Sequence, residues 1–273
     1  MKLLSPSRAA DGSALLNVGA GVHASAEWTN IDLADAPHVI RHDIRRGLPF
    51  ARETFDAVYA SHVLEHLSPD DGDALVAEMR RVLKRGGVLR LAVPDLERTV
   101  RAYLERLEAA RDADDPRYRW IKLELLDQLV RDRSGGLMVR ALREGAVDPQ
   151  DVRERIGDEL LDAVDALDAA PAPAPGAVAS GLRAKVLATG PGQRLRTFLL
   201  DRADPRKLGE VHRWMYDRVD LVALLRSHGF ADAAPTTHAV SRISHWERYR
   251  LDSTPDGARP RKPDSLFVEA TLR

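Results

Sequence analysis

Apolar and polar positions follow a strand-like pattern at intervals over the first third of the chain. Short apolar runs of β type alternate with helical or loop stretches. The four clearest runs cover residues 14–18, 28–33, 55–61 and 88–93. A helix is predicted over residues 73–87, ending on glycines, with Lys84 and Arg85 in its last turn where cations suit the helix dipole. This alternation predicts an α/β fold with a doubly wound, mostly parallel sheet.

Residues 97–208 have a different, helical texture. Val100, Tyr103, Leu104 and Leu107 recur at helical spacing, and residues 120–130 continue in the same style. An acidic amphipathic segment over 151–170 is followed by the sequence PAPAPG at 171–176, which predicts an exposed, semi-rigid linker. Beyond the linker the charge turns basic, through Arg183, Lys185, Arg194, Arg196, Arg202, Arg206 and Lys207.

The basic run has two interpretations. It is either a solvated surface or part of a helical lid whose arginines meet an anionic or hydroxyl-rich substrate. Residues 209–273 return to a compact pattern, with a helix before Gly229 and a closing strand over 265–273. The sequence therefore predicts a first core part over 1–96, a helical insertion or lid over 97–208, and a C-terminal part over 209–273 that completes the core.

Composition narrows the class of protein. The chain has 273 residues, of which 44% are hydrophobic and 30% charged, as expected for a globular protein with a substantial core. No run approaches the roughly 18 apolar residues of a membrane span, and the first residues lack a secretion signal, so we expect a cytoplasmic protein. A net charge of -1 argues against an obligatory nucleic-acid partner. A homodimer is left open.

The absence of cysteine excludes disulfides, thiolate metal sites and a cysteine nucleophile. Any metal would need histidine and carboxylate ligands.

A glycine pair marks the end of the first predicted strand. Gly19 and Gly21 let the backbone approach a ligand closely, and Asp32, at the end of the next strand, can accept hydrogen bonds from two ribose hydroxyls. Gly19, Gly21 and Ala24 also fit a dinucleotide fingerprint. However, residues 22–30 cannot hold the full helix that such a fingerprint requires, so a pyrophosphate would lose support. An adenosine without a diphosphate remains compatible with this stretch.

A third short strand ends before Asp43, whose carboxylate can accept from an adenine amino group while Ile44 covers the ring. Further motifs follow in order, so that the chain carries NVGAG, NIDL, HDIRRGLPF, FDAVYASHVLEHL and LKRGGVLRLAVPDLE. Together they resemble the class I S-adenosylmethionine-dependent methyltransferases over residues 15–97, and again at the C-terminal helix and strand. The resemblance implies a Rossmann-like fold and S-adenosylmethionine as cofactor.

The resemblance also implies a set of cofactor contacts. The glycine turn would line the methionine and ribose, and Asp32 would bind the ribose hydroxyls. Asp43 and Ile44 would contact the adenine, and residues 60–62 would form the floor below the sulfonium. Asn17 stands where many members of the family carry an acid. The implied cofactor-binding residues are Asn17, Gly19, Ala20, Gly21, Asp32, Leu33, Asp43, Ile44, Ala60 and Ser61.

The shortened stretch before Asp32 looks like a branch of the family that acts on sugars and glycans. We therefore expect O-methylation of a saccharide hydroxyl, which links substrate to fold by association only. A natural product, a lipid or a nucleic acid is the alternative acceptor, and a non-catalytic cofactor-binding module is a further alternative.

The catalytic candidates follow the strand over 55–61. If a helix begins at His62, then His62, Glu65 and His66 share one face. His62 could be a general base, since the usual pKa of histidine lies near neutrality. Alternatively, Glu65 and His66, with His62, could bind Mg²⁺ and activate a hydroxyl. A purely structural interpretation, with Glu65 as a cap and His66 as a packing residue, stays open.

Asp95 follows the strand over 88–93, at the edge of a parallel sheet that usually faces ligand. It could serve as base or ligand, or cap the next helix. A last cluster, His212, Arg213, Trp214 and Tyr216, is either core or interface, or a platform for the acceptor.

Overall fold

The structure is a computed structural model that describes residues 3–21, 23–33, 35–168 and 211–273. It divides into two compact units, one formed by residues 1–97 and 213–273 and the other by residues 98–212. Each unit is described by itself below.

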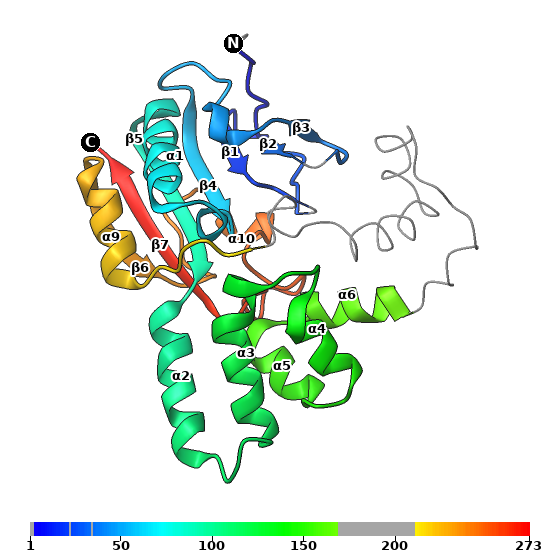
Figure 1. Cartoon of the computed structure of the whole chain (residues 1–273). Coiled ribbons are helices and arrows are strands. Elements are labelled where there is room, and N and C mark those ends of the chain that lie inside the picture. The colour runs from blue at the N-terminus through cyan, green and yellow to red at the C-terminus, as the bar shows by residue number, and fades with distance from the viewer. Residues whose placement is uncertain (1–2, 22, 34, 169–210) are drawn as a thin grey trace. The chain divides into compact units, whose positions relative to one another are not determined.

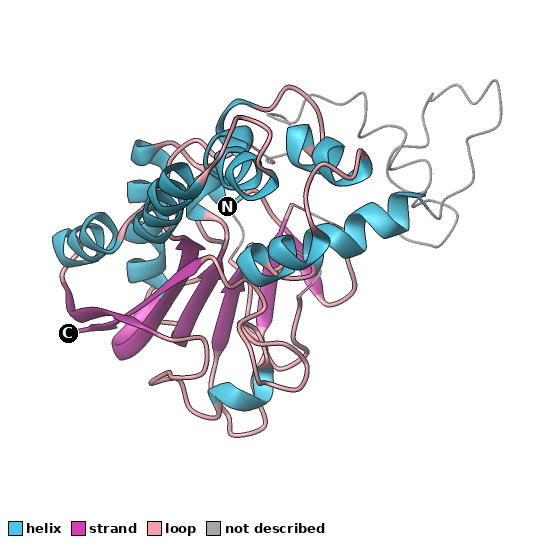
Figure 2. Ribbon diagram, turned by 90° about the horizontal axis from the view of Figure 1, so that it is seen from below, coloured by secondary structure: helices cyan, strands magenta, loops and turns pink. Residues whose placement is uncertain are grey.

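The first unit is built on a single sheet of seven strands, which Figure 2 shows as one continuous layer. The strands are β1 Leu15–Val18, β2 Thr29–Asp32, β3 Val39–Arg41, β4 Phe55–Ser61, β5 Leu83–Pro94, β6 Phe230–Thr236 and β7 Ser265–Leu272. Their order is β3-β2-β1-β4-β5-β7-β6 (Figure 1), with β1 to β5 parallel and β7 antiparallel to both neighbours. The predicted Rossmann-like, mostly parallel sheet is therefore confirmed.

Two helices cover one face of this sheet. Leu75, Val76 and Met79 of α1 (Pro69–Val82) and Leu221 and Leu225 of α9 (Arg218–Ser227) pack in the same core as the side chains of β1, β4, β5 and β7. Helix α1 begins where Ser68 accepts a hydrogen bond from the Asp71 backbone N–H, with a proline in the first turn. The sequence predicted a helix over residues 73–87, and the structure has a helix here that begins earlier, at Pro69.

The predicted end of α1 is wrong. The helix stops at Val82, and the following residues, including both glycines at 86 and 87, belong to β5. Leu83 is fully buried and pairs with Phe55 of β4, so strand pairing outweighs the local tendency to continue the helix. The last turn consequently carries Arg80 and Arg81.

The opposite face of the sheet is covered by a long irregular segment, residues 237–264, which contains only the short helix α10 (Trp246–Tyr249). Its rings pack against those of the sheet, with Trp28 and Tyr249 meeting edge to face at 5.3 Å. Fully buried Arg90 anchors the segment, because its Nε donates to Asp252 at 2.7 Å and its guanidinium lies 4.4 Å from the Trp246 ring centre.

The link between β1 and β2 contains no helix in the residues that the structure describes, as the spacing predicted. Two buried amides replace it. Asn17 donates to the Asn30 side-chain oxygen at 3.1 Å and to the His23 carbonyl at 3.3 Å. Asn30 in turn donates to the carbonyls of Ser25 and Trp28 at 2.8 and 2.9 Å. Side chains thus satisfy backbone groups that a helix would pair within itself.

In the part of the second unit that the structure describes, all regular structure is helical. It comprises most of α2 (Leu96–Ala109), then α3 Pro116–Val130, α4 Gly136–Arg143, α5 Pro149–Ile156 and α6 Glu159–Asp168. Trp120, Met138 and Val152 lie at its buried centre. On α2 the apolar positions Val100, Leu104 and Leu107 are 36%, 51% and 44% exposed, so the periodicity found a helix whose apolar stripe faces outward.

The linker over 171–176 and the basic run from Arg183 to Lys207 lie outside the described residues. Among the helices that the structure describes, none is long and apolar enough to cross a membrane.

Candidate functional site

The glycine turn after β1 is built from two positive-φ glycines with different surroundings. Gly19 has φ 71° and Gly21 has φ 52°, a region that favours glycine. A Cβ on Gly19 would lie 2.3 Å from Cγ2 of Val63, whereas a Cβ on Gly21 would meet no atom within 4 Å. Gly19 is therefore required for packing against the end of β4, and Gly21 leaves open space beside the turn. Ala20 is buried between them.

Asp32 is tied directly to this turn. Its Oδ2 accepts a hydrogen bond from the Gly21 backbone N–H at 2.9 Å, which joins the ends of β1 and β2. Leu33 follows with its side chain 56% exposed. An acid held beside the open glycine, with an exposed apolar residue next to it, has the groups needed for a ribose and an adjoining ring.

Asp43 and Ile44 lie at the end of β3. Asp43 caps the short 3-10 helix Ile44–Arg46 and accepts two hydrogen bonds from the Arg45 guanidinium, each 2.9 Å long. Hydrogen bonding from Arg45 lowers the pKa of the Asp43 carboxyl below its ordinary value. Ile44 is half-buried against the core. The proposed adenine contact of Asp43 would therefore be shared with Arg45.

The backbone turns sharply at the end of β4. Ala60 is buried, Ser61 is half-buried, and His62 has φ 54°, in the left-handed region. The helix considered at His62 is therefore absent: a single 3-10 turn spans Leu64–His66, and α1 starts only at Pro69. The left-handed turn at His62 is stabilised by its backbone N–H, which donates to the Ala92 carbonyl at 2.8 Å.

A buried row of three side chains crosses the sheet edge here. The Glu65 carboxylate oxygen Oε1 lies 3.0 Å from Nδ1 of His62, and Nε2 of His62 lies 2.8 Å from Oγ of Ser265. A negative carboxylate this close favours the tautomer with the proton on Nδ1 of His62, which leaves Nε2 to accept a hydrogen bond from Ser265. Glu65 is fully buried and the His62 side chain is 12% exposed. The row of three side chains is thus largely shielded from water.

Sequence reasoning missed Ser265. It opens β7, and only the insertion of β7 beside β5 brings it to the end of β4. No local pattern in the sequence connects a strand-opening serine to a histidine so far away.

His66 and Glu65 were the predicted metal ligands. Nε2 of His66 lies 4.0 Å from Oε1 of Glu65, close enough for one ion to contact both. However, Mg²⁺ prefers an octahedral shell of oxygens and keeps several waters, and here one fully buried carboxylate already faces His62. The donor set within this unit therefore matches Mg²⁺ poorly.

Asp95 lies directly between β5 and α2, and its backbone N–H donates to the Asp264 carbonyl at 2.8 Å. This places it at the same edge of the sheet as His62. Its role as base or ligand stays a prediction.

The segment after the second unit is held against the 3-10 turn. Backbone N–H groups of Arg213 and Trp214 both donate to the Glu65 carbonyl. Trp214 is 43% exposed but Tyr216 only 4%, and burial, followed by the charge of Glu65, raises the pKa of Tyr216 to about 12. The expected aromatic platform therefore has one exposed ring, Trp214, and one core ring. His212 is assigned to the other unit, where its backbone N–H donates to the Gln128 carbonyl.

A comparison with protein families agrees with the features described above. These are the sheet order, the glycine turn with its acid, and the histidine at the end of β4. Residues 16–91 match the family described as a methyltransferase domain. The chain is an S-adenosylmethionine-dependent methyltransferase. The matched part of the methyltransferase spans β1 to β5 and therefore includes the glycine turn, Asp32, Asp43 and the 3-10 turn.

No curated protein matches the sequence of this methyltransferase significantly. Solved structures with a similar fold include an S-adenosylmethionine-dependent methyltransferase from Thermotoga maritima, with 12% identity, coverage of 99% of this chain and 84% of that one, and a TM-score of 0.40. Another, from Archaeoglobus fulgidus, has 11% identity, coverage of 97% and 86%, and a TM-score of 0.38. The carbon methyltransferase CurJ has 13% identity, coverage of 98% of this chain and 50% of that one, and a TM-score of 0.38. Likeness at this level carries no information on the acceptor.

Proposed function

We propose that this methyltransferase transfers a methyl group to a hydroxyl oxygen, with a saccharide as the acceptor class. The observation that carries the proposal is the row of close contacts in which His62 lies 3.0 Å from Glu65 and is hydrogen-bonded to Ser265 at 2.8 Å. A hydroxyl must lose a proton when it is methylated, so an ordered base is useful for oxygen acceptors. A neutral amine acceptor has no such need before the methyl group is transferred.

The chain's own residues supply binding and proton transfer. The glycine turn and Asp32 would hold the adenosyl part, with Leu33, Asp43, Ile44 and Ala60 around it and Asn17 fixing the turn from behind. S-adenosylmethionine supplies an electrophilic methyl group on a sulfonium. The acceptor oxygen forms the new bond to this carbon while the carbon–sulfur bond breaks, and the binding residues would align the two and exclude water.

The proton would leave along the row. The acceptor hydroxyl gives its proton to Oγ of Ser265 as Ser265 gives its own to Nε2 of His62, so that the serine is unchanged. The imidazolium that forms is stabilised by Glu65, in the way a carboxylate supports a catalytic histidine elsewhere. Ser265 is therefore a positioning and relay group, and His62 is the base.

One further feature bears on the acceptor. The shortened link between β1 and β2 resembles that of the branch acting on sugars, which is the reason to name a saccharide.

The second version of the chemistry uses a metal: Glu65 and His66 would bind a divalent ion, with Asp95 as an additional ligand or base. The homodimer, the small-molecule or oligosaccharide acceptor and the cytoplasmic location stay sequence-based predictions.

The proposal is tested by incubating the full chain with S-adenosylmethionine labelled on its methyl group and a panel of saccharides, phenols, amines, lipids and RNA. We expect label in saccharide ethers, unchanged by EDTA. Label confined to amines or to carbon would overturn the assignment to oxygen. Loss of turnover in EDTA with recovery on added Mg²⁺ would favour the metal version over the base. Calorimetry with S-adenosylhomocysteine and NAD shows whether the protein has a cofactor site at all. It thereby distinguishes a protein that binds the cofactor without turnover from one that has no such site.

A further inference from the structure

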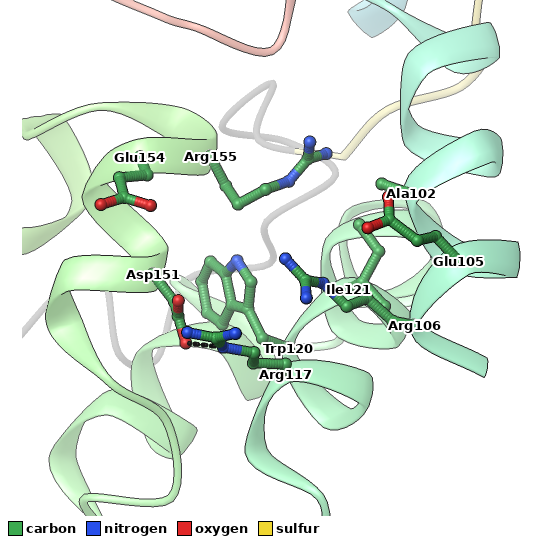
Figure 3. A pocket seen from close by; sticks show the side chains of 9 residues that line it. All are labelled: Ala102, Glu105, Arg106, Arg117, Trp120, Ile121, Asp151, Glu154 and Arg155. Carbon is green, nitrogen blue, oxygen red and sulfur yellow. Dashed lines mark hydrogen bonds and ion pairs between the residues drawn. The ribbon is translucent and has the colours of Figure 1, made fainter. Parts of the chain in front are cut away.

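A hollow in the helical second unit has the features of a binding site. It has a volume of about 110 Å³ and lies between α2, α3 and α5. Figure 3 shows the side chains around it. The lining residues are Ala102, Glu105, Arg106, Arg117, Trp120, Ile121, Asp151, Glu154 and Arg155. All belong to the second unit, so the hollow is complete without any contribution from the sheet.

Trp120 provides an unsatisfied hydrogen-bond donor at this hollow. The residue is 1% exposed, and its indole Nε1 has no acceptor within hydrogen-bonding distance among the described residues. Figure 3 shows this nitrogen directed into the hollow, on the side of the Arg106 and Arg155 guanidinium groups. An indole N–H can only donate, and buried donors are normally paired. A ligand with an acceptor atom would complete it.

Two arginines supply donors that suit an anion. Arg155 forms a two-point ion pair with the buried Glu124, in which Nε donates at 3.2 Å and Nη2 at 2.5 Å. The pair fixes the guanidinium and balances its charge, but Nη1 still has donors to offer. Arg106 is half-buried on α2 and has no ion pair or hydrogen bond to another described residue. Arg117 is engaged by Asp151 at 3.0 Å and closes one side.

The acidic residues of the lining do not cancel this charge. Asp151 is occupied by Arg117, and Glu154 accepts from Gln150 at 2.9 Å. Glu105 and Glu154 are exposed, whereas Arg106 and Arg155 are half-buried. The charge of Arg155 is balanced by Glu124, so Arg106 is the half-buried cation that has no described ion-pair partner. Because solvent screens exposed charges more than buried ones, its charge outweighs the exposed Glu105 and Glu154 where the indole N–H points.

We propose that this hollow binds the oxyanion of a small molecule, a carboxylate or a phosphate, with Trp120 Nε1, Arg106 and Arg155 as its donors. Planar guanidinium groups match both oxyanions. The enclosure by three helices favours a small molecule. The inference does not depend on the proposed acceptor, because it concerns the second unit alone.

The test follows the four indole N–H resonances of the ¹⁵N-labelled full chain, with the Trp120 resonance assigned from Trp120→Phe. Inorganic phosphate and acetate are added in separate titrations at constant ionic strength. We expect one resonance, that of Trp120, to move downfield and saturate, and the more effective anion identifies the source. Arg106→Gln should weaken the binding at least about tenfold, as expected for hydrogen bonds to a charged group. Arg119→Gln, which removes an equal charge from α3 outside the lining, should leave it unchanged.

No saturable shift with either anion would overturn the proposal. An equal loss of affinity in both arginine variants would also overturn it, because the effect would then come from net charge. If Trp120→Phe does not fold, the comparison of Arg106→Gln with Arg119→Gln, followed by calorimetry with the same anions, gives the same decision. Methyl transfer is not measured, so failure here is distinguishable from failure of the proposed function.

Discussion

Nε2 of His62 lies 2.8 Å from Oγ of Ser265, although 203 positions separate the two residues in the chain. The contact joins the end of β4 to the start of β7 and gives the imidazole a fixed hydroxyl partner. On its other side His62 faces a buried carboxylate, so both ring nitrogens have defined roles. This pair carries the proposed proton transfer.

Replacing His62 should therefore remove turnover and spare the cofactor site. His62→Asn is the suitable change, since asparagine tolerates the left-handed backbone at this position better than most residues. We expect kcat to fall by about 10² or more, the usual contribution of a general base. The affinity for S-adenosylhomocysteine, measured by calorimetry, should change little.

Ser265→Ala distinguishes a relay from a direct base. If Ser265 is a relay residue, the Ser265→Ala variant should have a lower kcat with a small change in the KM of the acceptor. His66→Asn is the matched comparison for the metal version. Full turnover in His62→Asn together with loss in His66→Asn would contradict the row of three residues.

Asp32 should control cofactor binding. Asp32→Asn removes a charged acceptor beside Gly21, so the affinity for S-adenosylmethionine should fall at least about tenfold. Asp35→Asn, an exposed acid close by in the sequence, serves as the control. Calorimetry gives the readout, and equal affinities in the two variants would remove Asp32 from the site.

The two glycines of the turn should respond differently to alanine. Gly19→Ala forces a Cβ into Val63 and a non-glycine residue into positive φ, so we expect a loss of stability of about 2–4 kcal/mol. Gly21→Ala has room for its Cβ, so its loss of stability should be smaller, and cofactor affinity should be the property that suffers. Thermal unfolding and calorimetry on both variants check this order. A more stable Gly19→Ala than Gly21→Ala would contradict the packing described at Val63.

Tyr216 should weaken the fold at alkaline pH. Its pKa is raised to about 12 in the folded protein, while an unfolded tyrosine titrates near about 10. The unfolded chain therefore loses its proton first, and stability falls as pH rises from about 10 to about 12, by about 2–3 kcal/mol in total. Tyr216→Phe should flatten this part of the stability curve, measured by urea unfolding.

Much of the sheet could be predicted from the sequence because its strands are short apolar runs whose burial follows directly from their composition. The run over 55–61 matches β4 at both ends. The missing helix between β1 and β2 could also be predicted, because a helix of normal length needs more residues than lie between Gly21 and Asp32. These features depend on local spacing.

What could not be predicted depends on pairing between distant segments. Local preference extends α1 through Lys84 and Arg85, but the pairing of Leu83 with Phe55 ends it earlier. His62 was found from its place after a strand, whereas its partner Ser265 depends on where β7 inserts. The hollow around Trp120 likewise combines three helices, and no spacing rule relates an indole on one to guanidinium groups on the other two.

The position of β7 between β5 and β6 has a consequence for how the enzyme is made. During synthesis the strands up to β5, with the cofactor loops, leave the ribosome early, but the final neighbour of β5 is the last strand to emerge. Until then the edge of β5 is open to other chains, and His62 has no hydroxyl beside it. The cofactor loops can therefore form before His62 gains its hydroxyl partner, and the edge of β5 stays open to pairing with other chains until β7 covers it.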